Sequence, residues 1–286
     1  MIRSPAGFGG DDRIKRYLDY YQAGNGVSML SPGNVFSPSS LFAASEQGVW
    51  YDPSDFSTMF QDSAGTVPVT AVGQVVGLIL DKSGRNNHAS QTGADANKPT
   101  LQTENGLYFL LFANDALSTG TITAGTNKAQ IFAGVRKLSD AAGAILAEYS
   151  ASYTSNLGSF NLGAPYDTTT QRYGAISRGN AVQSAGQGSY VTGTGAAPDT
   201  AVLTATFDIA GDSTIIRRNG TAFAAGTVDQ GTGNYGNYPL YLGRRGGTTA
   251  PYDGRLYGLI LRFGANLSAD TIVQTENWLN ARTGAY

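Results

Sequence analysis

The last fifty residues of the chain constrain its fold most, because two strands and one helix follow each other there. Apolar and β-favouring side chains predict strands over 238–243 and 255–263, with a loop rich in glycine and proline between them. Ser268 occupies the N-cap position of a helix predicted over 269–282, and Gly284 ends it. This segment therefore predicts a sheet protein closed by one short C-terminal helix.

Short strands recur through the middle of the chain. The 286 residues include 38 glycines and 16 tyrosines but only 14% charged residues, which is typical of short strands joined by tight turns. Asn219-Gly220 predicts a type I′ turn in a hairpin. This density of strands predicts an all-β fold of two stacked antiparallel sheets. The strands are predicted at 107–112, 130–137, 144–149, 159–162, 172–176, 202–209, 214–218 and 221–224.

Residues 1–40 differ from the rest of the chain. Apolar residues at helical spacing predict one amphipathic helix there, followed by an extended linker. An isolated helix of about a dozen residues is marginal in water, so it either packs on its own sandwich or docks on another subunit or a larger assembly. We therefore expect an attachment arm over 1–40 and a β-sandwich over 41–286. The apolar residues of the arm are Ile14, Tyr17, Leu18 and Tyr21.

Charge and composition exclude several classes of protein. The formal charge is −2, which provides no strong field for a nucleic acid partner. The sequence contains no run of 18 apolar residues, so it predicts no membrane-spanning helix. The first residues also lack the apolar core of a signal peptide. The absence of cysteine excludes disulfides, thiolate zinc sites and cysteine nucleophiles.

Two stretches resemble a known family. LYLG, a glycine-rich loop, DGRLYGLIL, LSAD and a WLN helix follow in the order of the C-terminus of concanavalin A-like (laminin G-like) lectin and glucanase sandwiches. The sequence motifs WYDPSD and LDKSGRNNHA, within residues 50–92, resemble those of a version of this domain found in tailed-phage and prophage proteins. The resemblance implies a jelly-roll sandwich of virion origin. It also implies that Asp81 and Ser83 fix a tight turn, with His88 packed beside it.

The residues argue against catalysis. Glucanases of this fold carry two carboxylates as E-x-D-x-E or E-x-D-x-x-E on one strand, and none of the four glutamates here has another acid two residues away. Glu148 alone sits on a predicted strand, as either an isolated catalytic candidate or a solvent-facing or hydrogen-bonded structural residue. His88 is the one histidine, either structural or a metal ligand or base. We therefore predict a protein that is not an enzyme.

No cofactor is predicted. Calcium is the one metal that the residue types allow, but no D-x-D-x-D-G loop occurs and aspartates in such turns usually cap their own backbone. Its candidate ligands are Asp52, Asp81 and Asp253. Glycan binding needs aromatic platforms with amide and guanidinium donors on loops, and such residues gather near the C-terminus. The candidate glycan-binding residues, which also suit any wet protein interface, are Asn234, Tyr235, Asn237, Tyr238, Arg244 and Arg245.

These observations lead to one functional hypothesis and one alternative. We expect a non-enzymatic bacteriophage virion protein, a head or tail surface component and homo-oligomer, which binds other virion proteins through its arm and contacts host-surface polysaccharide. The alternative is a glycan-degrading depolymerase, a glycoside hydrolase of the same fold.

Overall fold

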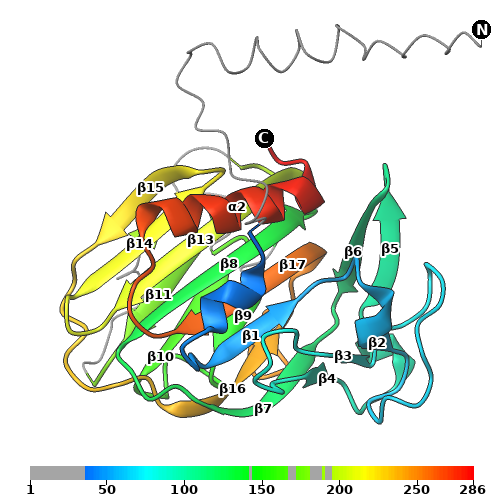
Figure 1. The fold of residues 1–286 in the computed structure, drawn as a ribbon, viewed down its shortest axis with the longest axis horizontal. Helices are drawn as coiled ribbons and strands as arrows, with labels where there is room; N and C mark the ends of the chain where they lie inside the picture. The colour runs from blue at the N-terminus through cyan, green and yellow to red at the C-terminus, as the bar shows by residue number, and fades with distance from the viewer. Residues whose placement is uncertain (1–35, 142–143, 167–171, 181–188, 191–194) are drawn as a thin grey trace, which may run out of the picture. The chain divides into compact units, whose positions relative to one another are not determined.

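The computed structural model describes residues 36–286 except 142–143, 167–171, 181–188 and 191–194. Within this part the predicted fold class is confirmed: two antiparallel sheets pack into a sandwich, and one α-helix follows at the C-terminus (Figure 1). The amphipathic helix predicted near residues 14–21 lies outside the described residues, so the arm stays a prediction.

The first sheet has eight strands. Its long central strands β8 and β17 pair over most of their length, and every pairing in the sheet is antiparallel. Strand β1 (Gly48–Tyr51) also pairs with β17, beside the main path. In spatial order the path is β15 (Thr221–Gly226), β14 (Ser213–Arg218), β13 (Asp199–Asp208), β8 (Lys128–Lys137), β17 (Asp253–Phe263), β6 (Leu107–Ala113) and β5 (Thr100–Glu104).

The second sheet has nine strands and faces the first. The chain crosses between the sheets repeatedly, since β6, β8 and β17 belong to the first and β7, β9 and β16 to the second. Among the described residues, the connections contain three short 3-10 helices, η1 (Pro38–Phe42), η2 (Phe56–Thr58) and η3 (Asp95–Asn97). In spatial order the second sheet is β12 (Ser189–Tyr190), β11 (Gly174–Arg178), β10 (Ser159–Gly163), β9 (Ile145–Tyr149), β16 (Asn237–Leu242), β7 (Leu117–Thr123), β4 (Ala89–Ser90), β3 (Leu78–Ile79) and β2 (Met59–Phe60).

Aromatic side chains fill the core between the sheets. Tyr149 of β9 stacks on Phe160 at 5.3 Å between ring centroids and meets Phe263 of the opposite sheet at 4.9 Å. Phe160 also stacks on Phe207 of the opposite sheet at 4.8 Å. Such pairs add about 0.5–1.5 kcal/mol each beyond the apolar area that they bury.

Helix α2 (Ala269–Thr283) begins and ends where the sequence predicted. The Ser268 hydroxyl accepts a hydrogen bond from the Thr271 amide, and Gly284 adopts a left-handed conformation at φ 60°. The helix lies across the outer face of the eight-stranded sheet (Figure 1). It approaches β8 so closely that a Cβ on Gly134 would stand 2.5 Å from the side chain of Thr283. The nine-stranded sheet therefore keeps an outer face that α2 does not cover.

The turn that begins at Asp81 has the predicted structure. The Asp81 carboxylate accepts from the amides of Trp50, Ser83 and Asn87 and from the Ser83 hydroxyl, at 2.7–3.0 Å. His88 Nδ1 accepts from the Asp81 amide at 3.0 Å. His88 is therefore a structural residue that fixes this turn.

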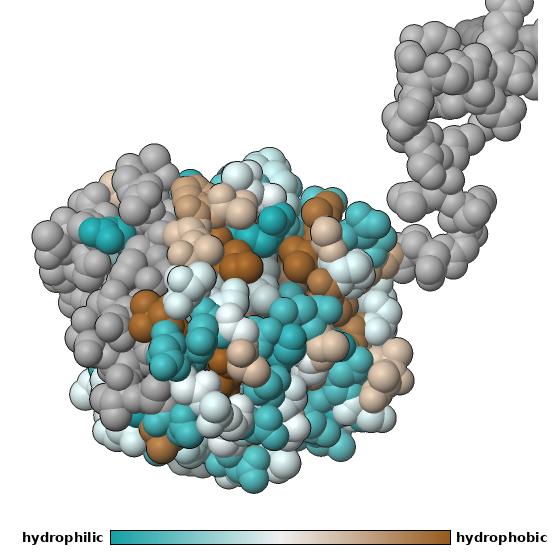
Figure 2. Space-filling model, turned by 90° about the vertical axis from the view of Figure 1, so that its left-hand side faces the viewer, coloured by the Kyte–Doolittle hydropathy of each residue, from teal (hydrophilic) through white to brown (hydrophobic). Residues whose placement is uncertain are grey.

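The predicted hairpin between β14 and β15 is confirmed. Asn219 and Gly220 both have positive φ, at 50° and 76°, as a type I′ turn requires. The β14–β15 side of the molecule faces the viewer in Figure 2. There the described hydrophobic residues are scattered among hydrophilic ones and form no continuous apolar patch.

The compact unit starts at Phe36, a few residues before the predicted boundary at 41. Leu41 and Phe42, at the end of η1, are buried, and the Arg262 guanidinium donates to the Leu41 carbonyl at 2.8 Å. Residues 36–40 therefore belong with the sandwich and not with the linker. No helix in the described part of the chain is long and apolar enough to cross a membrane.

Candidate functional site

A row of polar side chains crosses the centre of the nine-stranded sheet on its outer face. In β9, Ala147 and Tyr149 belong to the core, so strand alternation points Glu148 to the outer face. Glu148 pairs with Asn161 of β10 on one side and with Tyr241 of β16 on the other. Directly opposed Cβ atoms lie about 4.5–5.5 Å apart, so these three side chains start from neighbouring points of one surface.

Two loops cover Glu148. The Tyr153 amide donates to Oε1 of Glu148 at 2.6 Å, and Nε of Arg245 donates to Oε2 at 3.1 Å. Arg178 of β11 holds the first loop, because its Nη1 donates to the carbonyls of Tyr153 and Thr154 at 2.8 Å each. The Glu148 side chain has no exposed surface, whereas that of Arg245 keeps 31%. Arg245 is thus the member of the ion pair that solvent can reach.

Burial dominates the electrostatics of Glu148. It raises the pKa of this carboxyl above its usual value, against the lowering effects of the Tyr153 amide and the Arg245 charge. Desolvating a charge pair costs several kcal/mol per ion, so a buried pair is weak evidence for stability. A perturbed carboxyl with a specific charge partner is instead a reason to look for function.

Asn161 is the second unusual member of the row. It is fully buried, yet neither its Oδ1 nor its Nδ2 has a hydrogen-bond partner among the described residues. Leaving such a group unsatisfied costs about 1–3 kcal/mol, and native proteins contain few of them. A water or ligand atom that bonds the amide would remove this cost.

Tyr166 closes one end of the row. A Cβ on Gly174 would stand 2.5 Å from Cγ of Tyr166, and one on Gly163 would stand 2.9 Å from its Cα. Gly163 follows Asn161 by two residues on β10, and therefore on the same face. Arg245 lies over the ring of Tyr153, with Cζ at 5.2 Å from the ring centroid. Aromatic rings thus border the polar row.

Among the residues predicted to bind glycan, Arg245 reaches this row and Arg244 does not. Arg244 donates instead to the carbonyls of Asn114 and Thr248. Asn234 and Asn237 are exposed, away from these contacts.

The two predicted tyrosines have structural roles. Tyr235 is 3% exposed and shares a hydrogen bond with the Ser177 hydroxyl at 2.6 Å, so it is a core residue and not part of a glycan surface. Tyr238 packs edge-on against Tyr149 at 5.8 Å and donates to the Leu157 carbonyl. Their positions before and within β16 bring both rings toward the core.

The candidate calcium ligands are not grouped. Asp52 accepts from the guanidinium of Arg282, and Asp81 is occupied by its own turn. Asp253 begins β17 and is exposed. Across the described residues no three His, Cys, Asp or Glu side chains are placed to hold a metal ion together.

Sequence reasoning missed most of the row. A polar residue within a short apolar strand was a visible signal for Asn161 in SFNLG, as it was for Glu148 in AILAEY. The register that aligns these residues with Tyr241, 80 positions beyond Asn161, is not a local property. Of the structural roles predicted for Glu148, the structure shows the hydrogen-bonded one and not the solvent-facing one.

No family model and no curated protein matches this chain. Solved structures share its fold. An arabinofuranosidase complexed with arabinofuranosyl-α-1,2-xylobiose matches with a TM-score of 0.58 and 16% identity, over 87% of this chain and 65% of that one. Soaked with a cyclic sulfate inhibitor, GH54 α-L-arabinofuranosidase matches with a TM-score of 0.59 and 16% identity, over 87% and 66%. Trypanosoma rangeli sialidase matches with a TM-score of 0.53 and 13% identity, over 94% and 38%.

These matches correct the functional hypothesis. The expected non-enzymatic phage virion protein is overturned, because the matching structures named above are glycosidases and not phage structural proteins. They also conflict with the prediction that the protein is not an enzyme, although at these identities the likeness shows the fold alone. The chain spans less than two thirds of the arabinofuranosidases that it matches. The virion partners and the homo-oligomeric state predicted for this chain gain no support from these matches, and the concanavalin A-like resemblance stays a prediction.

Proposed function

We propose that this protein binds carbohydrate over the outer face of the nine-stranded sheet, with Arg245 and Tyr241 as the contacting residues. The observation that carries the proposal is the fixed guanidinium of Arg245. A buried carboxylate holds it from below and the Tyr153 ring supports it, yet 31% of its side chain remains exposed. Binding sites gain affinity from polar groups that are already in place before the ligand arrives.

The chemistry of this surface suits a sugar. A guanidinium has five N–H groups, and the bond from Arg245 Nε to Glu148 uses one, so the remaining donors can serve sugar hydroxyls. Tyr241, half-buried and paired with Glu148, supplies an aromatic face for the C–H side of a sugar ring. Glu148 and Tyr153 are positioning residues in this scheme, because they act on the ligand through Arg245. The carbohydrate ligand in an arabinofuranosidase that shares the fold supports the same ligand class.

The test is calorimetric titration with arabinoxylan oligosaccharides and with sialyllactose, the two glycan chemistries that the fold neighbours suggest. We expect Arg245→Lys, which keeps the charge but loses the planar fork, to weaken binding at least tenfold. Arg244→Lys is the matched control and should bind like the wild type, because Arg244 contacts only backbone carbonyls among its described partners. Equal affinity of both variants, or no binding of either glycan by the wild type, would contradict the proposal.

Glycoside hydrolysis is a second candidate, favoured by the raised pKa of Glu148. A general acid must be protonated near the working pH, and burial produces such a carboxyl in glycosidases. Two observations count against this candidate. Glu148 has no exposed surface, and the cross-strand neighbours Asn161 and Tyr241 supply no second carboxylate.

Release of nitrophenol from 4-nitrophenyl α-L-arabinofuranoside separates the two functions. A binding protein gives no release above the buffer rate. Hydrolysis by the wild type that disappears in Glu148→Gln, while oligosaccharide binding persists, would establish the enzyme instead.

A further inference from the structure

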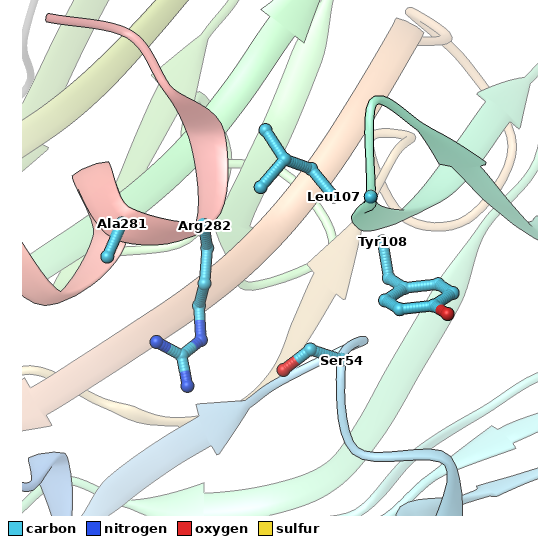
Figure 3. A pocket seen from close by; sticks show the side chains of 6 residues that line it. Ser54, Leu107, Tyr108, Ala281 and Arg282 are labelled. Atoms are coloured by element: carbon cyan, nitrogen blue, oxygen red, sulfur yellow. The ribbon is translucent and has the colours of Figure 1, made fainter.

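A separate pocket lies at the opposite sheet, beside the C-terminal end of α2. It is open to solvent and has a volume of about 260 Å³, a little below the range of pockets for drug-sized ligands. Figure 3 shows Arg282 on one side of it and Tyr108 on the other, with Ser54 below and between them and Leu107 above. The full lining is Ser54, Gly106, Leu107, Tyr108, Ala281 and Arg282.

The guanidinium of Arg282 is held firmly at this pocket. Its Nε and Nη2 donate to the two carboxylate oxygens of Asp52 at 3.2 and 3.0 Å, and its Nη1 donates to the Trp278 carbonyl at 3.3 Å. Its Cζ lies 3.5 Å from the centroid of the Trp278 ring. These three bonds use three of the five N–H groups of the guanidinium, which leaves two donors in a fixed place.

Ser54 supplies the complementary acceptor. Its hydroxyl donates to Oδ1 of Asp52 at 2.6 Å, so its hydrogen is committed and its oxygen lone pairs are left to accept. A ligand hydroxyl can therefore accept a hydrogen bond from Arg282 and donate one to Ser54. An alcohol can use both the donor and the acceptor. A carboxylate can only accept and an ammonium group can only donate, so each would use one of the two.

The surrounding charges balance. Asp52 faces Arg282, and Lys82 lies 2.6 Å from Asp55 and 3.6 Å from Asp52. The two acids and two bases sum to zero, so neither an anion nor a cation is favoured. Burial raises the pKa of Asp52, but the hydrogen bonds from Arg282 and Ser54 and the charges of Arg282 and Lys82 outweigh it, so the pKa lies below its usual value and the carboxylate stays ionised. Leu107 and Tyr108, both half-buried, line the pocket from strand β6, and the Tyr108 ring also packs edge-on against Phe56 at 5.0 Å between ring centroids.

We propose that this pocket binds one unit of a neutral sugar. Its hydroxyls meet Arg282 and Ser54, and its C–H groups contact the lining residues Leu107 and Tyr108. The site is distinct from the one at Arg245, because it is built on α2 and the β5–β6 hairpin of the eight-stranded sheet.

The test uses saturation-transfer NMR of the full chain with D-galactose, D-xylose and L-arabinose, and with D-glucuronate and D-glucosamine as charged comparators. It is run in the Arg245→Lys background, so that the other proposed site cannot supply the signal. Ala281→Trp adds a ring at an exposed position in the pocket lining, and Val273→Trp adds the same ring at an exposed position two helical turns away.

We expect at least one neutral sugar to give saturable transfer in the Arg245→Lys parent and with Val273→Trp. With Ala281→Trp its affinity should fall at least tenfold, at an unchanged melting temperature. The inference is overturned if Ala281→Trp binds like Val273→Trp, if the charged sugars bind more tightly than the neutral ones, or if the parent binds no sugar. If Arg245→Lys binds sugar as well as the wild type but Ala281→Trp removes the signal, the site at Arg245 fails and this one stands.

Discussion

Removing Arg245 is the perturbation that most directly probes the buried row. In Arg245→Ala the Glu148 carboxylate keeps one described partner, the Tyr153 amide, and stays fully buried. Breaking a buried pair by removing one partner costs about 3–5 kcal/mol. Because 31% of the Arg245 side chain is exposed, water can replace part of it, and we expect about 3 kcal/mol. For a domain of this size that lowers Tm by about 6–12 °C.

The stability cost of Arg245→Ala should depend on pH, and the direction of that dependence follows from the pKa of Glu148. The folded-state pKa of Glu148 lies above the unfolded value, so between the two values the native state binds more protons and stability falls as pH rises. Without Arg245 the folded pKa rises further, and the cost of the substitution grows with pH through that window. At acidic pH, where Glu148 is protonated in both states, the cost should shrink.

Thermal melts and urea titrations at pH 4 and pH 8 measure both effects. Arg244→Ala is the matched control and should change stability by less than about 1 kcal/mol at either pH. The double variant Arg245→Ala with Glu148→Gln should recover part of the loss at pH 8, because a neutral amide is cheaper to bury than an unpaired charge. Equal destabilisation by Arg245→Ala at both pH values, or no recovery in the double variant, would refute the reasoning.

Three further predictions concern the scaffold. Trp278→Ala should cost about 2–3 kcal/mol in chemical unfolding, less than for a fully buried ring, with Val273→Ala at an exposed position of the same helix nearly neutral. Asp81→Ala should cost about 3 kcal/mol because four hydrogen bonds lose their acceptor, and a melting curve equal to that of the wild type would remove Asp81 from its structural role. Gly134→Ala should lower stability by about 1–3 kcal/mol and loosen α2, because the new methyl collides with Thr283, and hydrogen exchange of the α2 amides would show this.

Local signals in the sequence predicted the parts of the fold that depend on neighbouring residues. Ser268 and Gly284 mark the helix ends because capping acts within one turn, and Asn219-Gly220 marks a hairpin because its backbone conformation is local. The Asp81 turn followed from a resemblance, and its hydrogen bonds within the segment confirm it.

The candidate site needed the tertiary structure because its members are far apart in the chain. Tyr235 and Arg245 stood in one predicted glycan segment, but the pleat and the loop turn one into the core and the other onto Glu148. Composition and periodicity determined that the chain forms two antiparallel sheets and a closing helix. Strand register and loop packing alone decided that Glu148, Asn161 and Tyr241 share one surface, because cross-strand contacts join residues whose separation in sequence carries no periodic signal.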